Sequence, residues 1–223
     1  MAFGPIMRLM VDGLQIELAP FSKDSMKEYV DPGMQQYSVI RYLGLSTANV
    51  VEDEEEWYER LRKDDDRLVW GIWVVASDGT RTIIGNTALN SIKRGHVLQA
   101  TSGSVIFRTE YWGRGIASAA HKARTWYAFH HLGLHRVKSA VLQGNHGSLK
   151  ALMRSGYTLV YTERNEQFVE GEMKHLDCLE CINPRDPFWT QWWHGDRPTG
   201  KHREARKQTL AVLEWAENNV SLP

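Results

Sequence analysis

Two glycines on either side of an arginine, Gly113 and Gly115, stand between a predicted strand and a predicted helix. The first N–H groups of a helix lack acceptors within the helix, and the helix dipole adds partial positive charge there. Glycine admits a positive φ and lets a ligand approach the backbone without a Cβ in the way. The turn therefore suits a phosphate. The same spacing also fits a helix whose glycines serve packing alone.

Three classes of phosphate ligand could use this turn. A P-loop requires G-x-x-x-x-G-K-[ST], and no Lys-Ser or Lys-Thr follows these glycines. A dinucleotide fingerprint requires a third glycine, where Ser118 stands, and an acid about 20 residues further on, where residues 133–138 are basic. Coenzyme A is the class that neither requirement excludes.

Asn145 and Ser148 form a second polar pair, three residues apart at the start of a predicted helix. Asn is a strong N-cap, so Asn145 has two interpretations, a cap and a ligand contact, and both can hold at once. Ser148 is either a serine bonded to the backbone of the first helical turn or a proton donor.

Cys178 and Cys181 form a C-x-x-C, with His175 just before them. A zinc site is one interpretation of this spacing. The segment has the pattern of a strand, however, in which residues three apart point to opposite faces. No second pair of ligands stands at zinc-finger spacing, so we expect no metal.

Acidic residues gather at 52–56 and 64–66. A solvated helix face and a solvated loop account for them without any function. They could also line a cleft for a cationic amine such as a polyamine or an aminoglycoside.

A mixed order of strands and helices must position these residues. Hydrophobic patterns predict strands at 14–18, 68–76, 81–90, 102–108, 135–142, 157–164 and 172–182. Capping and periodicity predict helices within 22–62 and at 115–131, 148–155 and 202–218. The order predicts an α+β fold.

The last forty residues differ from the rest. We expect a domain over 1–183 and a Trp-rich extension over 184–223 that ends in a helix. One stripe of that helix is formed by Ala205, Thr209, Val212, Leu213 and Ala216. The aromatic run 188–193 favours packing or an oligomer contact over ligand binding. A tail helix can also exchange between subunits, so a homodimer fits this pattern.

Composition excludes several classes of partner. The chain has 27 basic and 27 acidic residues and no block of Lys and Arg, so we expect no nucleic acid. No run approaches the roughly 20 apolar residues of a membrane span, and the N-terminal residues lack a signal-peptide core. Two cysteines do not make a disulfide framework, which predicts a cytoplasmic protein.

The order of several motifs resembles the GNAT family of acetyl-CoA-dependent N-acetyltransferases, and most of all its RimJ/RimL branch. The matching segments are EYWGRGIA at 110–117, LGLHRV at 132–137, N-x-x-S at 145–148 and SGY at 155–157. IRYLG at 40–44, EDEEEWYERL at 52–61 and IIGNTALN at 83–90 also agree. The resemblance covers roughly 12–183. It implies a GNAT fold, a central mixed and mostly antiparallel twisted sheet flanked by helices.

The resemblance also implies where acetyl-CoA binds. Backbone N–H groups of the turn hold the pyrophosphate, and these belong to Trp112, Gly113, Arg114, Gly115, Ile116 and Ala117. Asn145 contacts the pantetheine arm. The backbone at Ile106, Phe107 and Arg108 holds the oxyanion. Arg114 adds a charge contact from the solvent side.

The groups that move protons are less well defined by the resemblance. Ser148 stands where RimL-like members have a serine that protonates the leaving thiolate, and Leu152 replaces the tyrosine of many other members. Relatives carry a basic carboxylate where Ser102 stands. The remaining candidates for the base are Glu110, which departs from the Gln or Arg of the family, Glu172, His175 and a water chain.

Two functions follow from the resemblance. The first is an N-acetyltransferase that passes the acetyl group of acetyl-CoA to a primary amine by direct attack, the acceptor being a protein N-terminus or a small molecule. The second is a catalytically idle domain that binds an acyl-CoA as a sensor or scaffold. The absence of the basic carboxylate at Ser102 is the reason to retain this second function.

Overall fold

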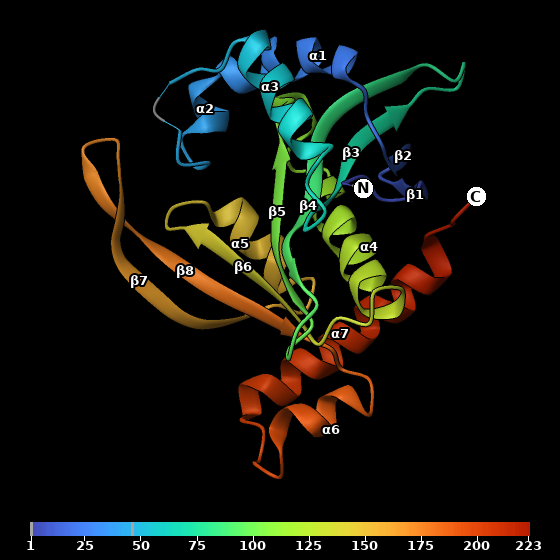
Figure 1. Ribbon diagram of the computed structural model, residues 1–223, viewed down its shortest axis with the longest axis vertical. Helices are drawn as coiled ribbons and strands as arrows, with labels where there is room; N and C mark the ends of the chain where they lie inside the picture. The colour runs from blue at the N-terminus through green and yellow to red at the C-terminus, as the bar shows by residue number, and fades with distance from the viewer. Residues whose placement is uncertain (1, 46) are drawn as a thin grey trace.

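The computed structural model describes residues 2–45 and 47–223 of the chain. Within these residues eight strands form one sheet (Figure 1): β1 (Met7–Val11), β2 (Leu14–Ala19), β3 (Leu68–Val75), β4 (Arg81–Lys93), β5 (Gln99–Ile106), β6 (Arg136–Leu142), β7 (Thr158–Val169) and β8 (Glu172–Ile182). The α-helices are α1 (Met26–Val30), α2 (Tyr37–Ile40), α3 (Val51–Leu61), α4 (Ile116–His130), α5 (His146–Met153), α6 (Phe188–Trp193) and α7 (Gly200–Asn219).

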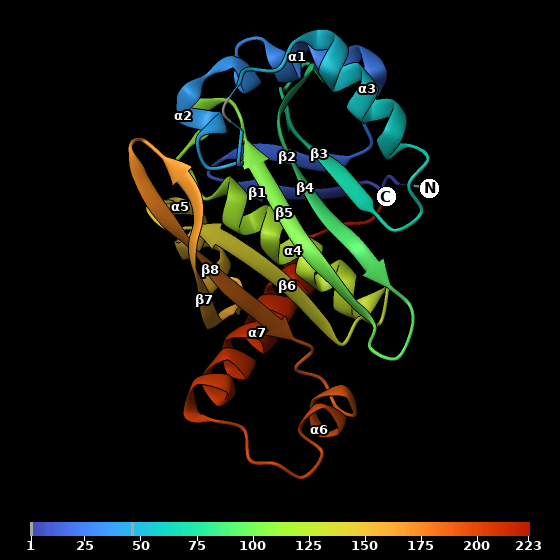
Figure 2. The same cartoon turned by 60° about the vertical axis from the view of Figure 1, so that its left-hand side comes forward.

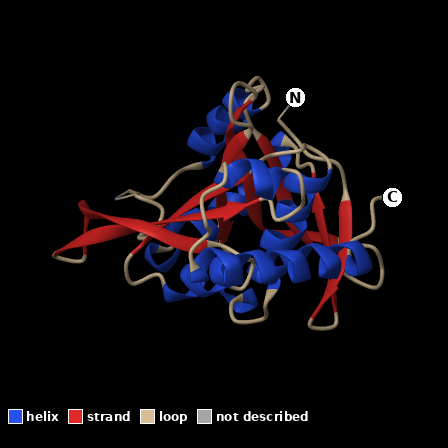
Figure 3. Cartoon of the chain, turned by 90° about the horizontal axis from the view of Figure 1, so that it is seen from below, coloured by secondary structure: helices blue, strands red, loops and turns tan. Residues whose placement is uncertain are grey.

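The strand order is β1-β2-β3-β4-β5-β6-β8-β7. Each pair of neighbours is antiparallel except β5 and β6, which run parallel. Parallel neighbours need a long crossover connection, and α4 supplies it. The long β7–β8 hairpin extends away from the body of the molecule (Figure 3). This arrangement confirms the predicted α+β fold with a mixed, mostly antiparallel sheet.

The sheet separates two hydrophobic cores. Successive side chains of a strand point to opposite faces, and the adjacent residues Val69 and Trp70 accordingly belong to different cores. One core packs against α4 and α7, which lie behind the strands in Figure 2. The other core packs against α1 and α3. Ligands that reach the sheet therefore meet different helices on its two faces.

Helix α7 lies against the central domain. Its buried residues are Thr209, Val212, Leu213 and Ala216, which confirms the predicted stripe except at the half-buried Ala205. Leu213 and Ala216 belong to the core that α4 faces. Beyond the helix, the backbone N–H of Ser221 donates to the carbonyl of Arg8 in β1 at 2.9 Å.

The aromatic run before α7 packs within the chain. Trp189 is buried, and the guanidinium of Arg206 lies 4.9 Å from its ring centre. The guanidinium of Arg136 in β6 lies at the same distance from the ring of Trp192. These contacts join the short helix α6 to α7 and to the sheet.

Candidate active site

The turn between β5 and α4 has the backbone that its glycines predict. Gly113 has φ of +77° and Gly115, the N-cap of α4, has φ of +81°. A Cβ at Gly113 would meet no atom within 4 Å, and one at Gly115 would meet only Val11 Cγ1 at 4.0 Å. Gly115 supplies no side-chain cap, so the first N–H groups of this 15-residue helix stay open to a ligand. A phosphate fits there because no side chain occupies the space.

Two side chains of the turn are held by neighbouring elements. The indole Nε1 of Trp112 donates a hydrogen bond to the carbonyl of Ile106, at the end of β5, at 2.8 Å. The guanidinium Nε of Arg114 lies 2.6 Å from the carboxylate of Asp12, in the turn between β1 and β2. Arg114 was expected to add a charge contact to the pyrophosphate from the solvent side; it is partly exposed, and its guanidinium forms this ion pair.

Strands β5 and β6 part beside this turn. Only three residue pairs join the two strands, and the last of these pairs is Thr101 with Lys138. Beyond it the strands diverge (Figure 2). Beyond that point β5 continues through residues 102–106 and β6 through residues 139–142, paired only with β4 and β8 respectively. We call these two unpaired edges the β5–β6 fork. Unpaired strand edges offer backbone N–H and C=O groups to an extended ligand.

Strand alternation identifies which groups of β5 face the fork. The carbonyl of Leu98 accepts from the N–H of His135, so it points toward β6. Backbone groups of alternate residues point the same way along a strand, which directs those of Ser102, Ser104 and Ile106 into the fork. The bond from Trp112 to the carbonyl of Ile106 agrees with this direction.

The expected oxyanion donors need correction at two of three positions. The N–H groups of Phe107 and Arg108 both donate to the carbonyl of Ile84 in β4, at 2.9 and 3.4 Å. Strand alternation directs the N–H of Phe107 toward β4, and the N–H of Arg108 reaches the same carbonyl, so both groups are engaged away from the fork. Ile106 retains an N–H directed into the fork.

The start of α5 carries the second polar pair. Asn145 is the N-cap of the helix, and its Oδ1 accepts from the backbone N–H of Ser148 at 3.1 Å. Both residues are half-buried. Leu152 is buried in the core that α4 faces, so no hydroxyl reaches the fork from that position. The structure thus bears out the cap, and the amide nitrogen of Asn145 stays open for a ligand.

The candidate bases lie in different settings. Glu110 is exposed, with its carboxylate 3.9 Å from Nη1 of Arg108. Glu172 is paired with Lys174, which lowers the pKa of its carboxyl. Nδ1 of His175 accepts a backbone N–H at 3.1 Å. Glu172 and one nitrogen of His175 are therefore already engaged.

Three buried polar groups lie between β5 and α4; the sequence patterns singled out Ser102 as the position of the missing carboxylate but not His121 or Arg124. Ser102 is 7% exposed, His121 is 4% exposed and Arg124 is fully buried. Ser102 Oγ, His121 Nδ1 and Arg124 Nε have no hydrogen-bond partner among the described residues. Burial lowers the pKa of His121 well below 6.5, and the charge of Arg124 adds to that effect.

A buried carboxyl lies on the opposite face, in α3. Glu54 is 5% exposed and accepts from the amide of Asn49 at 2.6 Å. Burial raises the pKa of its carboxyl, and the hydrogen bond from Asn49 opposes that rise. The rest of the acidic run 52–56 is exposed or half-buried, as a solvated helix face predicts.

The two cysteines of the C-x-x-C are free thiols in β8. Cys181 is buried, its Sγ lies 3.6 Å from Thr209 Oγ1, and burial raises the pKa of its thiol to about 12. Across residues 2–45 and 47–223 no three His, Cys, Asp or Glu side chains come together in a way that could hold a metal ion.

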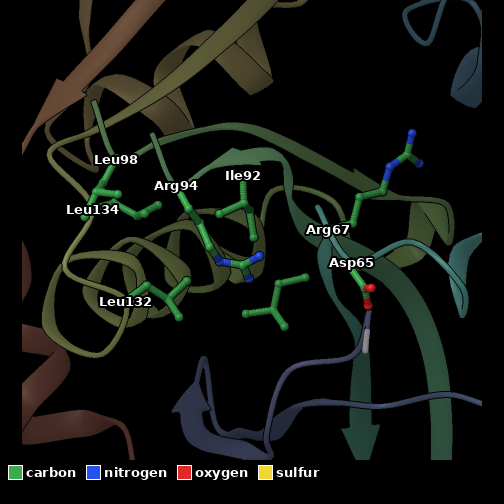
Figure 4. A pocket seen from close by; sticks show the side chains of 8 residues that line it. Asp65, Arg67, Ile92, Arg94, Leu98, Leu132 and Leu134 are labelled. Carbon is green, nitrogen blue, oxygen red and sulfur yellow. The ribbon is translucent and has the colours of Figure 1, made fainter. Parts of the chain in front are cut away.

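A cavity of about 430 Å³ lies at the other end of the sheet, where β5 begins (Figure 4). Leu98, Leu132 and Leu134 line it together with Arg94 from the β4–β5 loop. The fork opens toward the end of β5, so this cavity is not part of the site. In the described part of the chain, no helix has the length and apolar character to span a membrane.

Sequence comparison identifies relatives along most of the chain. Residues 15–158 match the family described as Acetyltransferase (GNAT) domain. A probable N-acetyltransferase of Bacillus subtilis, YjcK, is 31% identical over 153 residues, which are 68% of this chain and 82% of the relative.

Solved structures share the fold. RimJ of Mycobacterium smegmatis, solved in complex with CoA-disulfide, has a TM-score of 0.72 at 15% identity and covers 99% of this chain and 97% of its own. Spermidine N-acetyltransferase of Vibrio cholerae, in complex with CoA and spermine, has a TM-score of 0.65 at 17% identity and covers 75% of this chain and 95% of its own. With the family match and the YjcK relative, the chain belongs to the GNAT family and is an acetyl-CoA-dependent N-acetyltransferase.

Proposed function

We propose that the protein transfers the acetyl group of acetyl-CoA to a primary amine in the β5–β6 fork, and that the amine belongs to a protein N-terminus or a small molecule. One observation carries the proposal. The open N-terminus of α4 and the unpaired edges of β5 and β6 meet at one end of the sheet. A phosphate and an extended amide-bearing arm need these two kinds of backbone group.

The residues that hold the co-substrate follow from that geometry. The N–H groups of the turn from Gly113 to Ala117 face the pyrophosphate, whereas that of Trp112 donates to the carbonyl of Thr109 at 3.0 Å. Ser104 and Ile106 offer backbone groups from one edge of the fork, and Asn145 offers its amide nitrogen from the other. The N–H of Ile106 is the donor that we assign to the oxyanion, because those of Phe107 and Arg108 are engaged.

Acetyl-CoA supplies a thioester whose carbonyl carbon accepts the nitrogen of a neutral amine. The new C–N bond forms, the C–S bond breaks, and the electron pair stays on sulfur. Ser148 is the side chain that we assign to the protonation of the thiolate, since it lies in the first turn of α5 beside Asn145. The proton of the amine leaves through water, with Glu110 as the second candidate.

The acceptor enters from the face that α1–α3 cover, because α4 and α5 take the co-substrate on the other face. Two contacts frame this entrance. Arg41 pairs with Glu170, near the tip of the β7–β8 hairpin, at 2.8 Å. The hydroxyl of Tyr42 donates to the carbonyl of Gly144, at the end of β6, at 3.1 Å. An amine that reaches the fork passes between these elements.

The experiment is a two-part acceptor panel. Purified protein and acetyl-CoA are incubated with N-terminal peptides in one set and with polyamines and other small amines in the second, and both free thiol and acetylated amine are measured. We expect turnover with one set. Tight CoA binding without an acetylated product in either set would contradict the proposal and favour the sensor or scaffold.

A further inference from the structure

The guanidinium of Arg124 is fully buried between α4 and the sheet. Its Nη1 donates to Thr87 Oγ1 in β4 at 2.7 Å and to the carbonyl of Gly103 in β5 at 3.1 Å. Its Nη2 lies 3.4 Å from the hydroxyl of Tyr157, between α5 and β7. One side chain of α4 thereby joins β4, β5 and the residue that precedes β7.

No carboxylate compensates this charge. None of the ion pairs formed by the described residues includes Arg124, and its three contacts are neutral acceptors. A buried charge without an opposite charge is costly, and an apolar side chain at this position would avoid the cost. The packing of α4 therefore does not explain why a guanidinium is here.

The position of Arg124 relates it to the fork. Gly103 stands two residues beyond Thr101, the last residue of β5 that pairs with β6. Tyr157 follows α5, the helix that begins with Asn145 and Ser148. The guanidinium therefore lies beneath the sheet beside the narrow end of the fork, where it contacts a β5 carbonyl and the hydroxyl of the residue that precedes β7.

The ionisable groups around Arg124 do not cancel its charge. Burial keeps the pKa of His121, one helical turn earlier in α4, well below 6.5, and the imidazole is neutral at pH 7. Burial raises the pKa of the Cys181 thiol in β8 to about 12, so that group is neutral as well. Neither of these two groups therefore neutralises the charge of Arg124.

We propose that Arg124 is a positioning residue of acetyl transfer, whose buried charge favours the negative charge that gathers on the thioester oxygen and then on the departing thiolate. The inference rests on the proposed function, because it assumes that the thioester lies in the fork. A fixed charge in a site shielded from water needs no reorganisation during the reaction, which is the condition for efficient electrostatic stabilisation.

The test measures the pKa of the thiol of bound CoA. The ultraviolet absorbance of the thiolate is titrated in the complex of CoA with the wild-type protein, with Arg124→Met and with Arg124→Lys. Protein without CoA provides the blank, and the raised pKa values of Cys178 and Cys181 keep that blank low. Tyr157→Phe is the matched control, because it removes a contact of the guanidinium and keeps the charge.

We expect the bound thiol to titrate below free CoA in the wild-type protein. Arg124→Met should raise its apparent pKa by about one unit, the order expected from the loss of a single buried charge at an effective dielectric constant near 20. In Arg124→Lys and Tyr157→Phe the apparent pKa of the bound thiol should stay near the wild-type value. With an accepted amine, kcat of Arg124→Met should fall about tenfold and KM for acetyl-CoA should change less.

An Arg124→Met protein that unfolds cooperatively, binds CoA as the wild type does and shows the wild-type thiol pKa would overturn the inference. If that variant does not fold, a wild-type complex whose thiol titrates at or above free CoA overturns it equally. The titration needs no acceptor. A failure of the proposed function, seen as absence of turnover on every amine, is therefore distinguishable from a failure of this inference.

Discussion

The indole nitrogen of Trp112 donates a hydrogen bond to the backbone carbonyl of Ile106 at 2.8 Å. This bond ties the turn that we assign to the pyrophosphate to the strand edge that we assign to the pantetheine arm. The bond also fills the last carbonyl on that side of β5, while the N–H of Ile106 stays available. Both parts of the co-substrate site are thus fixed relative to each other by one side chain.

Trp112→Phe keeps the aromatic ring and removes the donor. Because the indole is 46% exposed, we expect a modest loss of about 1 kcal/mol in the free energy of unfolding. KM for acetyl-CoA should rise several-fold, since the turn is no longer held to β5, and kcat should change little. Steady-state kinetics and urea unfolding provide the measurements. A change confined to kcat would argue against this role.

Gly115→Val tests the phosphate turn against a matched control. A valine at φ of +81° costs about 1–2 kcal/mol of strain but meets only Val11, so the fold should survive. CoA binding, measured by calorimetry, should be lost because the Cβ occupies the phosphate position. Gly79→Val places the same strain, at φ of +85°, in the β3–β4 turn and should leave binding intact. Equal affinities of the two variants would refute the assignment.

Asn145 and Ser148 can be separated by substitution. Asn145→Asp keeps an oxygen for the N–H of Ser148, so stability should stay close to wild type, whereas Asn145→Ala should lose about 1 kcal/mol. Both variants lack the amide nitrogen and should bind acetyl-CoA more weakly. Ser148→Ala should lower kcat about tenfold or more with little effect on CoA affinity. An unchanged kcat would assign the proton to solvent.

His121 makes stability depend on pH in a defined direction. Its folded-state pKa is depressed below 6.5, so the unfolded chain binds the proton more readily and stability falls as the pH drops below 6.5. His121→Leu should remove that part of the slope and should be more stable than wild type by about 1 kcal/mol at about pH 5.5. Urea unfolding at about pH 5.5 and about pH 7.5 provides the measurement.

His96→Leu is the control for that comparison, because His96 is exposed in the β4–β5 loop. If His121→Leu retained the full wild-type slope, the imidazole would have to be solvated or partnered in the folded state.

Helix α7 offers a comparison between two leucines. Leu213 is 2% exposed in the core that α4 faces, and Leu210 is 43% exposed on the same helix. We propose that residues 184–223 form a structural part of the domain, so Leu213→Ala should cost about 2–4 kcal/mol and Leu210→Ala well under 1 kcal/mol. Similar thermal unfolding of both variants would show that the extension folds separately from the domain.

The sequence patterns predicted much of this architecture. Alternation located most strands, and the glycines located the turn, because positive φ and a helix start leave local signals. The patterns missed β1, a short strand whose partners β2 and Ser221 lie in other segments. They also missed α6, because Pro187 and the tryptophans that follow it indicated packing and did not indicate a helix. Long-range contacts determine both elements.

The sequence predicted those parts of the site whose backbone conformation depends on neighbouring residues in the chain, such as the glycine turn and the cap of α5. The N–H groups of Phe107 and Arg108 were misassigned because both donate to the carbonyl of Ile84 in the neighbouring strand, and such pairing leaves no trace in the sequence. Arg124 and His121 were missed because a polar residue on an alanine-rich helix suggests a solvated face. Only the packing of α7 on the far side of α4 makes that helix buried almost all round.

The stoichiometry of acetyl transfer tests the proposed reaction. Acetyl-CoA with a labelled acetyl group is incubated with the protein and each acceptor set, and free thiol and labelled amine are counted in the same sample. Acetyl transfer in the fork requires one labelled amine for each thiol released with one acceptor set, and it requires that Gly115→Val is inactive. Thiol release without any labelled amine, or no release from a protein that binds CoA, would contradict it.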